Sequence, residues 1–354
     1  MKKNILIVGT GTIGEPLIGL LADLKNKLQI DVYFNKRTPL ADEVAKVESL
    51  INRGAKLVTS PVRKKKFEKM GHAVTCTYEE ALKKADVVID CTPAGNENKE
   101  LYYLPSMKLD DKKRTFIAQG SEKGFGVPYA YGINDEVLNE KTNFIQVVSC
   151  NTHNIACIIR TLSPSTNDII SSDFTCIRRA NDISQEGSFI ASPYVGKHND
   201  SQFGTHHARD VYDLFRTRNE FINIYSSALK VNSQYMHVVR FNMEVKGFLS
   251  KERVLQRLKE NKFVSLTEKQ LANKVFSFGR DHGYYGRIFN QTVVSEPSIS
   301  VNLLNGSTRI AGFCFTPQDG NSLLSSIAAA LYGLHGSAYA DHLKTFDKFL
   351  FQNI

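Results

Sequence analysis

A glycine-rich turn that follows an apolar run near the N-terminus constrains the fold of this chain more than any other feature. Residues 4–8 (NILIV) have the length and composition of a buried strand, and residues 9–14 (GTGTIG) carry the pattern G-x-G-x-x-G at the start of a helical stretch. In this context the first glycine makes a tight turn, the second lets the backbone approach a pyrophosphate, and the third packs the helix on the strand. The alternative is a purely structural turn. We expect a dinucleotide to bind at Gly9, Gly11, Thr12, Ile13 and Gly14.

The end of the second expected strand, residues 30–34, bears on the choice of cofactor. It is followed by Asn35, Lys36, Arg37 and Thr38 instead of the Asp or Glu that would bind a free ribose 2′-hydroxyl group. Two cations and a hydroxyl group suit a 2′-phosphate. We therefore expect NADP, or mixed use of NADP and NAD, with Lys36, Arg37 and Thr38 as phosphate contacts; the alternative is a solvated turn.

Strands and helices alternate through the first 150 residues. Further apolar runs of strand length lie at residues 85–91, 115–120 and 144–148. This alternation predicts an α/β fold with a doubly wound (Rossmann) parallel sheet, in a dinucleotide-binding domain over residues 1–149. The loops after the strands line the cofactor crevice in such a fold, which adds Thr92 and Gly120 to the expected cofactor contacts.

Cys150 lies where a reactive thiol would be built. Residues 147–152 (VVSCNT) end an apolar strand and begin an apparent helix, with Ser149 as the expected N-cap. A thiolate is the nucleophile, and its pKa falls at a helix N-terminus. The alternative is a buried cysteine without chemistry, but ligands bind at the C-terminal ends of strands in a doubly wound sheet. We also expect Ser149 and Thr152, which frame the cysteine, to contact substrate.

The remaining residues have a different character. Segments 173–179, 221–225, 237–245 and 308–315 are rich in β-formers and partly alternate between apolar and polar residues. This pattern predicts a mixed or antiparallel sheet with one covered face, in an α+β catalytic domain over residues 150–320. From about residue 321 to 354 apolar residues recur at helical spacing, which predicts a C-terminal helix that completes the first domain.

The charge balance and the cysteines limit the classes of partner. The net charge of +9 fits either nucleic acid or small anionic ligands. Because the charge is distributed and no RNA-binding motif with interleaved aromatic residues is present, we favour anionic ligands. No apolar run approaches the ~18–20 residues that span a bilayer, and no CxxC pair suggests a metal site. We expect a cytoplasmic protein without a metal, membrane or nucleic-acid partner.

Seven motifs in order resemble one enzyme family. They are GTGTIG at 9–14, DVVIDCTPAG at 86–95, FIAQGSEKG at 116–124, VVSCNT at 147–152, IRRA at 177–180, HHARDV at 206–211 and MHVVRFN at 236–242. Together they resemble the archaeal-type (type II) glyceraldehyde-3-phosphate dehydrogenases over nearly the whole chain. The resemblance implies a phosphorylating enzyme of glycolysis or gluconeogenesis and a homotetramer. It also implies a phosphorylated aldehyde, inorganic phosphate, and NADP or NAD as ligands.

The resemblance also implies roles for individual residues. Cys150 would attack the aldehyde, Asn151 would orient the thiohemiacetal oxygen, and His237 would serve as the base. Near the nicotinamide, two amides would hold the carboxamide: Gln318 and Asn321. Four basic residues fall where phosphate groups are held. The two arginines among them are adjacent, and adjacent residues of a strand point to opposite sides, so only one of the two arginines should touch ligand. These four are Arg178, Arg179, His206 and His207.

Two positions depart from the family pattern. Residues 150–157 are CNTHNIAC, with His153 and Cys157 where the family has threonine and arginine. Either His153 replaces a lost phosphate contact or the substrate differs from the triose phosphate. The alternatives are therefore a related reductase of an acyl phosphate or acyl thioester, of the aspartate-semialdehyde dehydrogenase type, and a non-catalytic dinucleotide-binding protein.

Overall fold

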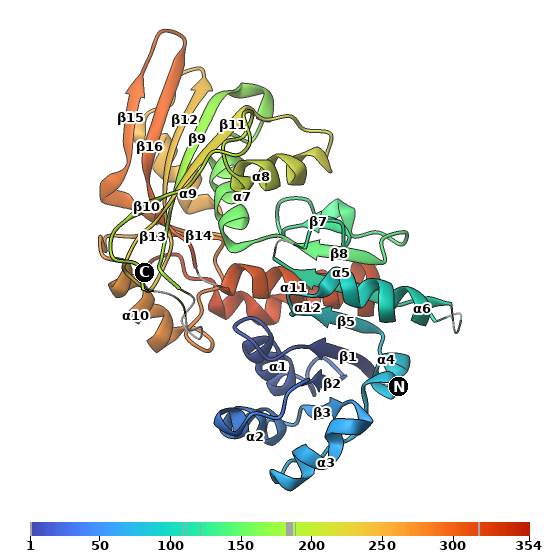
Figure 1. The fold of residues 1–354 in the computed structure, drawn as a ribbon. Coiled ribbons are helices and arrows are strands. Elements are labelled where there is room, and N and C mark those ends of the chain that lie inside the picture. Colours follow the sequence, from blue (N-terminus) through green and yellow to red (C-terminus); the bar gives the residue numbers. More distant parts are fainter. Residues whose placement is uncertain are drawn as a thin grey trace. The chain divides into compact units, whose positions relative to one another are not determined.

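Two compact units make up the chain (Figure 1). The computed structural model describes residues 2–108, 110, 112–120, 122–181, 187, 189–317 and 319–354. No helix within these ranges is long and apolar enough to cross a membrane. The assignment of dinucleotide binding to residues 1–149 and 321–354, and of catalysis to residues 150–320, stays a prediction. Unit 1 comprises Met1–Val127, Glu136–Val147 and Ser325–Thr345, and unit 2 comprises Pro128–Asp135, Val148–Leu324 and Phe346–Ile354.

Unit 1 is built on the doubly wound parallel sheet that the sequence predicts. The strand order is β4-β3-β2-β1-β5-β6-β8-β7, and the pairs from β4 to β8 are parallel. The chain runs outward from β1 to β4, returns to β5 beside β1, and then runs outward the other way, which makes a switch point between β1 and β5. The strands are β1 (Lys3–Val8), β2 (Ile30–Asn35), β3 (Lys56–Thr59), β4 (Cys76–Thr77), β5 (Val87–Asp90), β6 (Thr115–Gln119), β7 (Val127–Tyr129) and β8 (Phe144–Val147).

Helices cover this sheet. They are α1 (Gly14–Asp23), α2 (Val44–Asn52), α3 (Pro61–Lys69), α4 (Tyr78–Lys84), α5 (Gly95–Asn98), α6 (Leu104–Met107), α11 (Gly320–His335) and α12 (Tyr339–Leu343). Leu6 of β1 shares a core cluster with Leu82 of α4, and Ile5, which points to the other face, is fully buried as well. The part of α11 that belongs to unit 1 packs on β5 and β6, where Gly333 lies against Thr115. Burial on both faces explains the continuous apolar runs of the strands.

Unit 2 contains the mixed sheet that the sequence predicts; the alternation typical of one covered face occurs along residues 238–246, whereas residues 264–267 and 292–295 are buried throughout. The order is β10-β11-β9-β12-β16-β14-β13, and β15 also pairs with β16. Strands β9 and β11 are parallel, whereas β12 is antiparallel to both β9 and β16. Along β12, buried residues alternate with partly exposed ones. The strands are β9 (Ile169–Arg178), β10 (Tyr194–Val195), β11 (Ile224–Lys230), β12 (Val238–Lys246), β13 (Val264–Thr267), β14 (Thr292–Ser295), β15 (Ser300–Leu303) and β16 (Ser307–Phe315).

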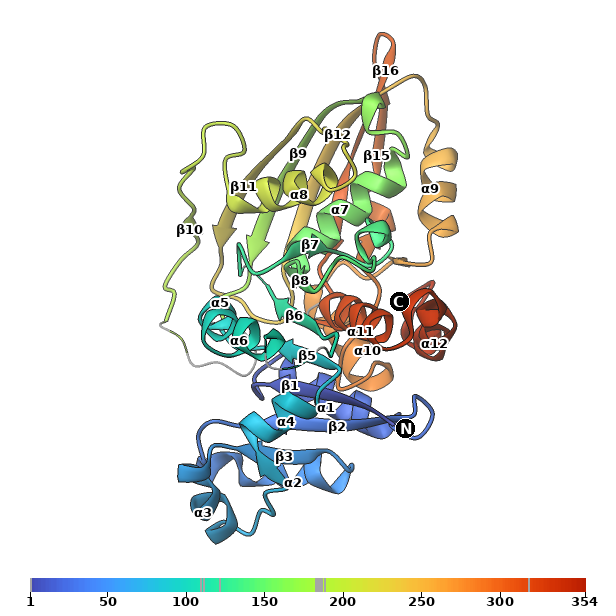
Figure 2. The ribbon, with the colours of Figure 1, turned by 90° about the vertical axis from the view of Figure 1, so that its right-hand side faces the viewer.

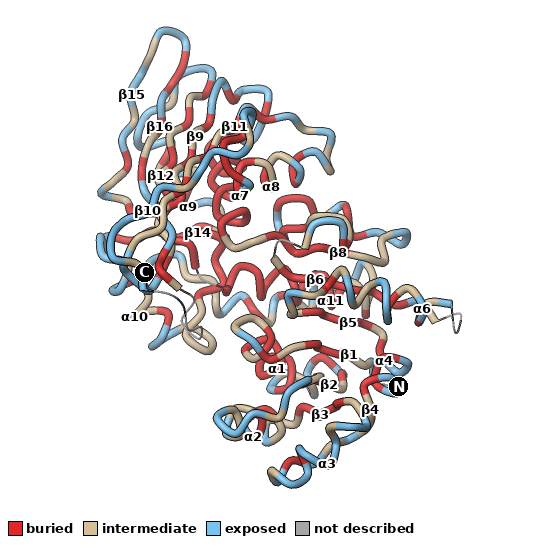
Figure 3. Tube along the Cα trace, viewed as in Figure 1, coloured by how far each residue is buried: buried red, intermediate tan, exposed pale blue. Residues whose placement is uncertain are grey.

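Helix α7 lies at the centre of unit 2. The helices of this unit are α7 (Cys150–Leu162), α8 (His206–Arg216), α9 (Lys251–Glu260) and α10 (Ala272–His282). Figure 2 shows α7 and α8 across one face of the sheet formed by β11, β9 and β12. Residues 151–159 of α7 are all buried (Figure 3), and Ile155 and Ile158 share a core cluster with Phe174 and Phe241. Because α7 is enclosed in this way, packing fixes the position of its first residue.

Candidate active site

The glycine turn after β1 has the shape that its sequence pattern predicts. Gly9 has φ +96°, a conformation that favours glycine, and a Cβ atom added there would lie 3.0 Å from Thr92 Cγ2. A Cβ atom on Gly14 would overlap the carbonyl oxygen of Gly9, so α1 approaches β1 this closely only with glycine. On Gly11, by contrast, it would meet no described atom within 4 Å. This open space beside the N-terminus of α1 fits a pyrophosphate, with Thr12 and Ile13 completing the turn.

The three residues expected to bind a 2′-phosphate lie in different environments. Lys36 is buried, and its ammonium group pairs with Glu43 and donates to Thr10 Oγ1 at 3.4 Å. Burial works to raise the pKa of Glu43, but hydrogen bonds from Lys36 and a second lysine outweigh it and lower this pKa. The charge of Lys36 is therefore already balanced inside the turn. Arg37 and Thr38 are exposed, so Arg37 is the cation of the three that solvent and ligands reach.

A buried carboxylate that the sequence analysis missed organises the loop after β5. Asp90 is fully buried and accepts hydrogen bonds from Tyr103 at 2.6 Å, Asn98 at 2.8 Å and the Thr92 hydroxyl at 2.6 Å. The hydroxyl proton of Thr92 is therefore donated to Asp90 within the loop. Gly120, which follows β6, has φ +74°. The available signal for Asp90 was an acidic residue at the end of an otherwise apolar strand.

Cys150 is the first residue of α7 and is partly exposed. Ser149 is the N-cap, as predicted: its Oγ accepts from the Thr152 N–H at 3.3 Å and lies 2.8 Å from Thr152 Oγ1. Thr152 is fully buried, so its hydroxyl serves the cap. The carbonyl oxygen of Cys150 accepts from Asn321 Nδ2 at 3.0 Å. The backbone of Cys150 is thus held at a helix N-terminus, where the helix dipole favours a negative charge.

Asn151 and His237 are both bound to Thr316. The Thr316 hydroxyl donates to Asn151 Oδ1 at 2.9 Å, and the Thr316 N–H donates to the His237 carbonyl oxygen at 3.0 Å. His237 Nδ1 in turn accepts from the Arg179 N–H at 3.0 Å. Burial, with the charges of Arg179 and Arg178, lowers the pKa of His237 to about 3. The ring is therefore neutral near pH 7 and carries its proton on Nε2.

The basic residues expected near phosphate divide into exposed and buried ones. Arg178 and His206 are exposed, whereas Arg179 and His207 are 2% and 3% exposed. The Arg179 guanidinium donates to the Tyr235 carbonyl oxygen at 2.9 Å. The two histidines begin α8, with their ring centroids 4.0 Å apart. Arg178 is therefore the arginine of the pair that is accessible to a ligand.

His207 is a buried imidazole at the N-terminus of α8. Neither of its ring nitrogens has a hydrogen-bond partner among the described residues. Burial lowers the pKa of His207 well below its usual value, and the nearby groups of His206, Arg178 and His237 lower it further. An anion at this position would supply an acceptor for the buried ring and would be attracted by the Arg178 guanidinium. The helix dipole of α8 acts in the same direction.

The two positions that depart from the family pattern are buried in unit 2. His153 is fully buried with its Nδ1 2.9 Å from the Ser149 carbonyl oxygen, and burial lowers its pKa to about 4 despite this contact. Cys157 is 1% exposed in the core cluster, and burial raises its pKa to about 12. Both side chains thus pack inside the unit, so His153 is not an accessible replacement for a phosphate contact.

Two amides were expected to hold a nicotinamide carboxamide. Gln318 lies outside the described residues. Asn321 is fully buried, and its Nδ2 donates to the carbonyl oxygens of Cys150 at 3.0 Å and Gln291 at 3.2 Å. Its amide therefore supports the Cys150 backbone, a role the sequence analysis missed, and a cofactor contact stays a prediction. The sequence analysis likewise missed Thr316, which binds Asn151 and His237.

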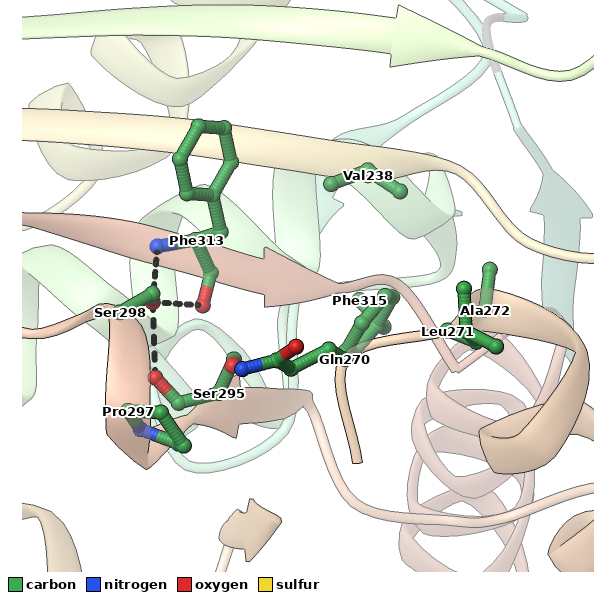
Figure 4. A pocket seen from close by; sticks show the side chains of 9 residues that line it. All are labelled: Val238, Gln270, Leu271, Ala272, Ser295, Pro297, Ser298, Phe313 and Phe315. Atoms are coloured by element: carbon green, nitrogen blue, oxygen red, sulfur yellow. Dashed lines mark hydrogen bonds between the residues drawn. The ribbon is translucent and has the colours of Figure 1, made fainter. Parts of the chain in front are cut away.

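A pocket of about 350 Å³ lies in unit 2, with Val238 of β12 and with Phe313 and Phe315 of β16 in its wall (Figure 4). The Ser298 hydroxyl accepts from the Phe313 N–H at 2.8 Å and donates to the Ser295 carbonyl oxygen at 2.7 Å along its wall. Val238 and Phe315 adjoin His237 and Thr316 in the chain, but alternation along the strands turns them to the other face. The pocket is therefore separate from the candidate site. It is lined by Val238, Gln270, Leu271, Ala272, Ser295, Pro297, Ser298, Phe313 and Phe315.

Known proteins similar to this chain are archaeal enzymes with a common name. The chain is 30% identical over 322 residues to a glyceraldehyde-3-phosphate dehydrogenase of Thermococcus sibiricus, covering 85% of each sequence. It is 30% identical over 270 residues to the enzyme of that name from Methanococcoides burtonii, covering 73% of this chain and 72% of the relative. For the Sulfolobus acidocaldarius enzyme of that name, identity is 28% over 320 residues, covering 85% and 84%. No protein-family model matches the chain.

Proposed function

The chain belongs to the archaeal-type glyceraldehyde-3-phosphate dehydrogenase family and is an NAD(P)-dependent oxidoreductase of an aldehyde, and on this premise we propose the phosphorylating reaction. In that reaction glyceraldehyde 3-phosphate and inorganic phosphate give 1,3-bisphosphoglycerate, as in glycolysis or gluconeogenesis. One observation carries the proposal: Cys150 begins α7, while Asn151 and His237 are both bound to Thr316. A homotetramer in the cytoplasm is part of the same proposal.

Cys150 is the proposed nucleophile. Its thiolate sulfur bonds to the aldehyde carbon, and the carbonyl oxygen takes the electron pair. Asn151 presents the hydrogens of its Nδ2 to this oxygen. Once the carbon has been oxidised, a thioester remains on Cys150. Inorganic phosphate then adds to the thioester carbon and expels the Cys150 thiolate, so the acyl phosphate leaves and the enzyme is restored.

His237 is the proposed partner of the thiohemiacetal oxygen. While its Nδ1 accepts from the Arg179 N–H, the ring proton is on Nε2, and His237 stabilises that oxygen as a donor. It serves as the base for the hydroxyl proton only when the Arg179 contact opens and Nε2 is unprotonated. The two states titrate differently, so the pH dependence of turnover separates them.

The N-terminus of α8 is the proposed phosphate site. His207 supports it because it is 3% exposed and its ring nitrogens have no partner among the described residues. Arg178 and His206 are exposed, and the Arg178 guanidinium adds a positive charge. Arg179 holds the Tyr235 carbonyl oxygen instead, so we assign it the support of His237 rather than direct binding.

The glycine turn of unit 1 is the proposed cofactor site. Its open space at Gly11 and the N-terminus of α1 fit a pyrophosphate, and Arg37 and Thr38 are exposed where a 2′-phosphate would lie. A dinucleotide held there would supply the acceptor for the hydride that the oxidation releases. Lys36 balances Glu43, so we propose NADP or dual use with Arg37 as the main determinant. An Arg37→Ala variant should then raise KM for NADP and leave KM for NAD unchanged.

A direct assay tests the proposed function. Purified protein with glyceraldehyde 3-phosphate, inorganic phosphate and NADP or NAD should generate reduced cofactor, seen by its absorbance. Omitting phosphate should limit the reaction to about one turnover per site, because the thioester is then not released. An absence of reduced cofactor with either dinucleotide would contradict the proposal. Activity with a carboxylate-bearing or thioester substrate alone would instead support the related reductase.

A further inference from the structure

We propose that Thr316 is a positioning residue whose hydroxyl group turns the Asn151 amide so that Nδ2 faces the thiohemiacetal oxygen. The inference rests on the proposed function and extends it to a residue far from the VVSCNT motif. Thr316 directly follows β16 and is fully buried. It lies within hydrogen-bond distance of two asparagines of α7, Asn151 and Asn154.

The direction of these hydrogen bonds is set by Cys314. Its sulfur lies 3.2 Å from Asn154 Oδ1 and 3.6 Å from the Val239 carbonyl oxygen, and the shorter contact takes the single thiol proton. Burial raises the pKa of Cys314 to about 12, so the thiol keeps its proton at neutral pH. Asn154 must then turn its oxygen toward Cys314 and its Nδ2 toward Thr316 Oγ1, which lies 2.8 Å away.

The hydrogen bond from Asn154 to Thr316 determines how Thr316 binds Asn151. A hydroxyl group has one proton, and because Thr316 Oγ1 accepts from Asn154, that proton is available to Asn151 Oδ1 at 2.9 Å. With Oδ1 held, the two hydrogens of Nδ2 lie on the other side of the amide. A flipped Asn151 would leave the Thr316 proton without this acceptor and would turn an oxygen toward the negative thiohemiacetal oxygen. Both effects favour the orientation in which Asn151 is a donor.

The backbone N–H of Thr316 makes a separate hydrogen bond, to His237. Its N–H donates to the His237 carbonyl oxygen at 3.0 Å and continues the pairing of β12 with β16. Any substitution of the side chain other than proline retains this bond. A change to the hydroxyl group therefore tests the orientation of Asn151 without removing the support of His237.

Helix α7 offers a matched control at its other end. The Thr161 hydroxyl donates to the Cys157 carbonyl oxygen at 2.7 Å and accepts from Asn261 Nδ2 at 2.7 Å. Thr161 is 6% exposed, so it too is a buried threonine that accepts from an asparagine. It lies outside the candidate site. Thr161→Val likewise removes one buried threonine hydroxyl that is bound to α7, and it leaves the contacts of Asn151 intact.

The experiment compares Thr316→Val, Thr316→Ser and Thr161→Val in steady-state kinetics. Thr316→Val should lower kcat about 10- to 100-fold, which is at or below the effect of losing one oxyanion donor. KM values should stay within about twofold of wild type. Thr316→Ser should restore kcat to near the wild-type value, and Thr161→Val should retain it. NADPH binding, followed by fluorescence, should be unchanged in all three variants.

A double-mutant cycle identifies the residue through which Thr316 acts. On an Asn151→Ala background, Thr316→Val should lower kcat no further, because no amide is left to orient. Additive losses, equal losses in Thr316→Val and Thr161→Val, or no recovery in Thr316→Ser would each overturn the inference. If Thr316→Val does not fold, Asn154→Ala frees the Thr316 hydroxyl to turn, and an unchanged kcat in that variant also overturns it.

The proposed function fails in a different way. A wild-type protein that oxidises no aldehyde, or a Cys150→Ser variant as active as wild type, refutes the proposed reaction and the inference with it. An active wild type, an inactive Cys150→Ser variant and an unimpaired Thr316→Val variant refute the inference alone.

Discussion

The glycine turn of unit 1 and the N-terminus of α7 in unit 2 are built in different ways. In the turn, three glycines within one short segment act through backbone shape: Gly9 through its positive φ, Gly14 because a Cβ atom would collide, and Gly11 because it leaves space. At α7, Cys150 and Asn151 depend on side chains of Asn321 and Thr316, which are 171 and 165 positions away in the sequence. A local pattern specifies the first site, whereas only the complete fold specifies the second.

The largest expected effect comes from removing the thiol at α7. Cys150→Ser should lower kcat at least about 10³-fold, because a serine hydroxyl is a far weaker nucleophile than a thiolate. NADPH affinity belongs to the glycine turn and should be unchanged in a fluorescence titration. Cys76→Ser, which changes a partly exposed thiol of unit 1, should retain both properties. Normal turnover in Cys150→Ser would place the nucleophile elsewhere.

The next effect is the contribution of one buried histidine of α7 to the pH dependence of stability. Burial lowers the pKa of His153 from 6.5 to about 4. The unfolded chain therefore takes up this proton near pH 6.5 and the folded chain only near pH 4, so the contribution to stability is present above pH 6.5 and is lost as pH falls to about 4. At about 1.4 kcal/mol per pH unit the loss is about 3 kcal/mol at most.

Replacing His153 should remove its share of this pH dependence. His153→Thr should lessen the fall in the free energy of unfolding between pH 6.5 and 4, measured by urea unfolding at several pH values. His282→Gln, at an exposed position on α10, should keep the wild-type pH dependence. Equal curves for wild type and His153→Thr would show that the buried histidine is not linked to unfolding.

A smaller pair of effects separates the glycines of the turn. Gly14→Ala should lower the free energy of unfolding by roughly 1–3 kcal/mol, because the added methyl group overlaps the Gly9 carbonyl oxygen. Gly11→Ala should leave stability unchanged and weaken cofactor binding about tenfold, because its methyl group enters the space of the pyrophosphate. Thermal unfolding and a cofactor titration measure the two properties. Equal destabilisation by both changes would contradict the distinct roles of these glycines.

The smallest expected effect concerns His237, which should not contribute a titration to the pH profile of kcat/KM. With a pKa of about 3, His237 is neutral above that pH. The dependence of kcat/KM on pH near pH 6.5 should therefore have the same shape in wild type and in a His237→Gln variant. The comparison with His237→Gln removes the titration of the substrate phosphate, whose second pKa is about 6. An inflection present only in wild type would show that the Arg179 contact opens and that His237 works as the base.

The fold follows from the sequence because its determinants are local. Continuous apolar runs such as residues 4–8 predict strands buried on both faces, and the alternation in 237–245 predicts a sheet covered on one face. The glycine turn and the Ser149 cap are specified by neighbouring residues in the same way. Each of these predictions needs only one segment of chain.

The remainder of the candidate site could not be predicted because its contacts join distant segments. Nothing in the sequence near Thr316 shows that it binds Asn151, and Asn154 looks like any polar residue of a helix until Cys314 is placed beside it. The pairing of Lys36 with Glu43 likewise removes a cation that the sequence assigns to a phosphate. A sequence pattern shows which groups are present, but not which of them are already bonded to each other.

One measurement tests the central claim, that Cys150 carries the acyl group, most directly. The protein is mixed with glyceraldehyde 3-phosphate and the dinucleotide in the absence of inorganic phosphate, then digested and analysed by mass spectrometry. We predict a 3-phosphoglyceroyl adduct on the peptide that contains Cys150, and its loss when phosphate is added before digestion. An adduct on another cysteine, or no adduct while reduced cofactor still accumulates, would contradict the account.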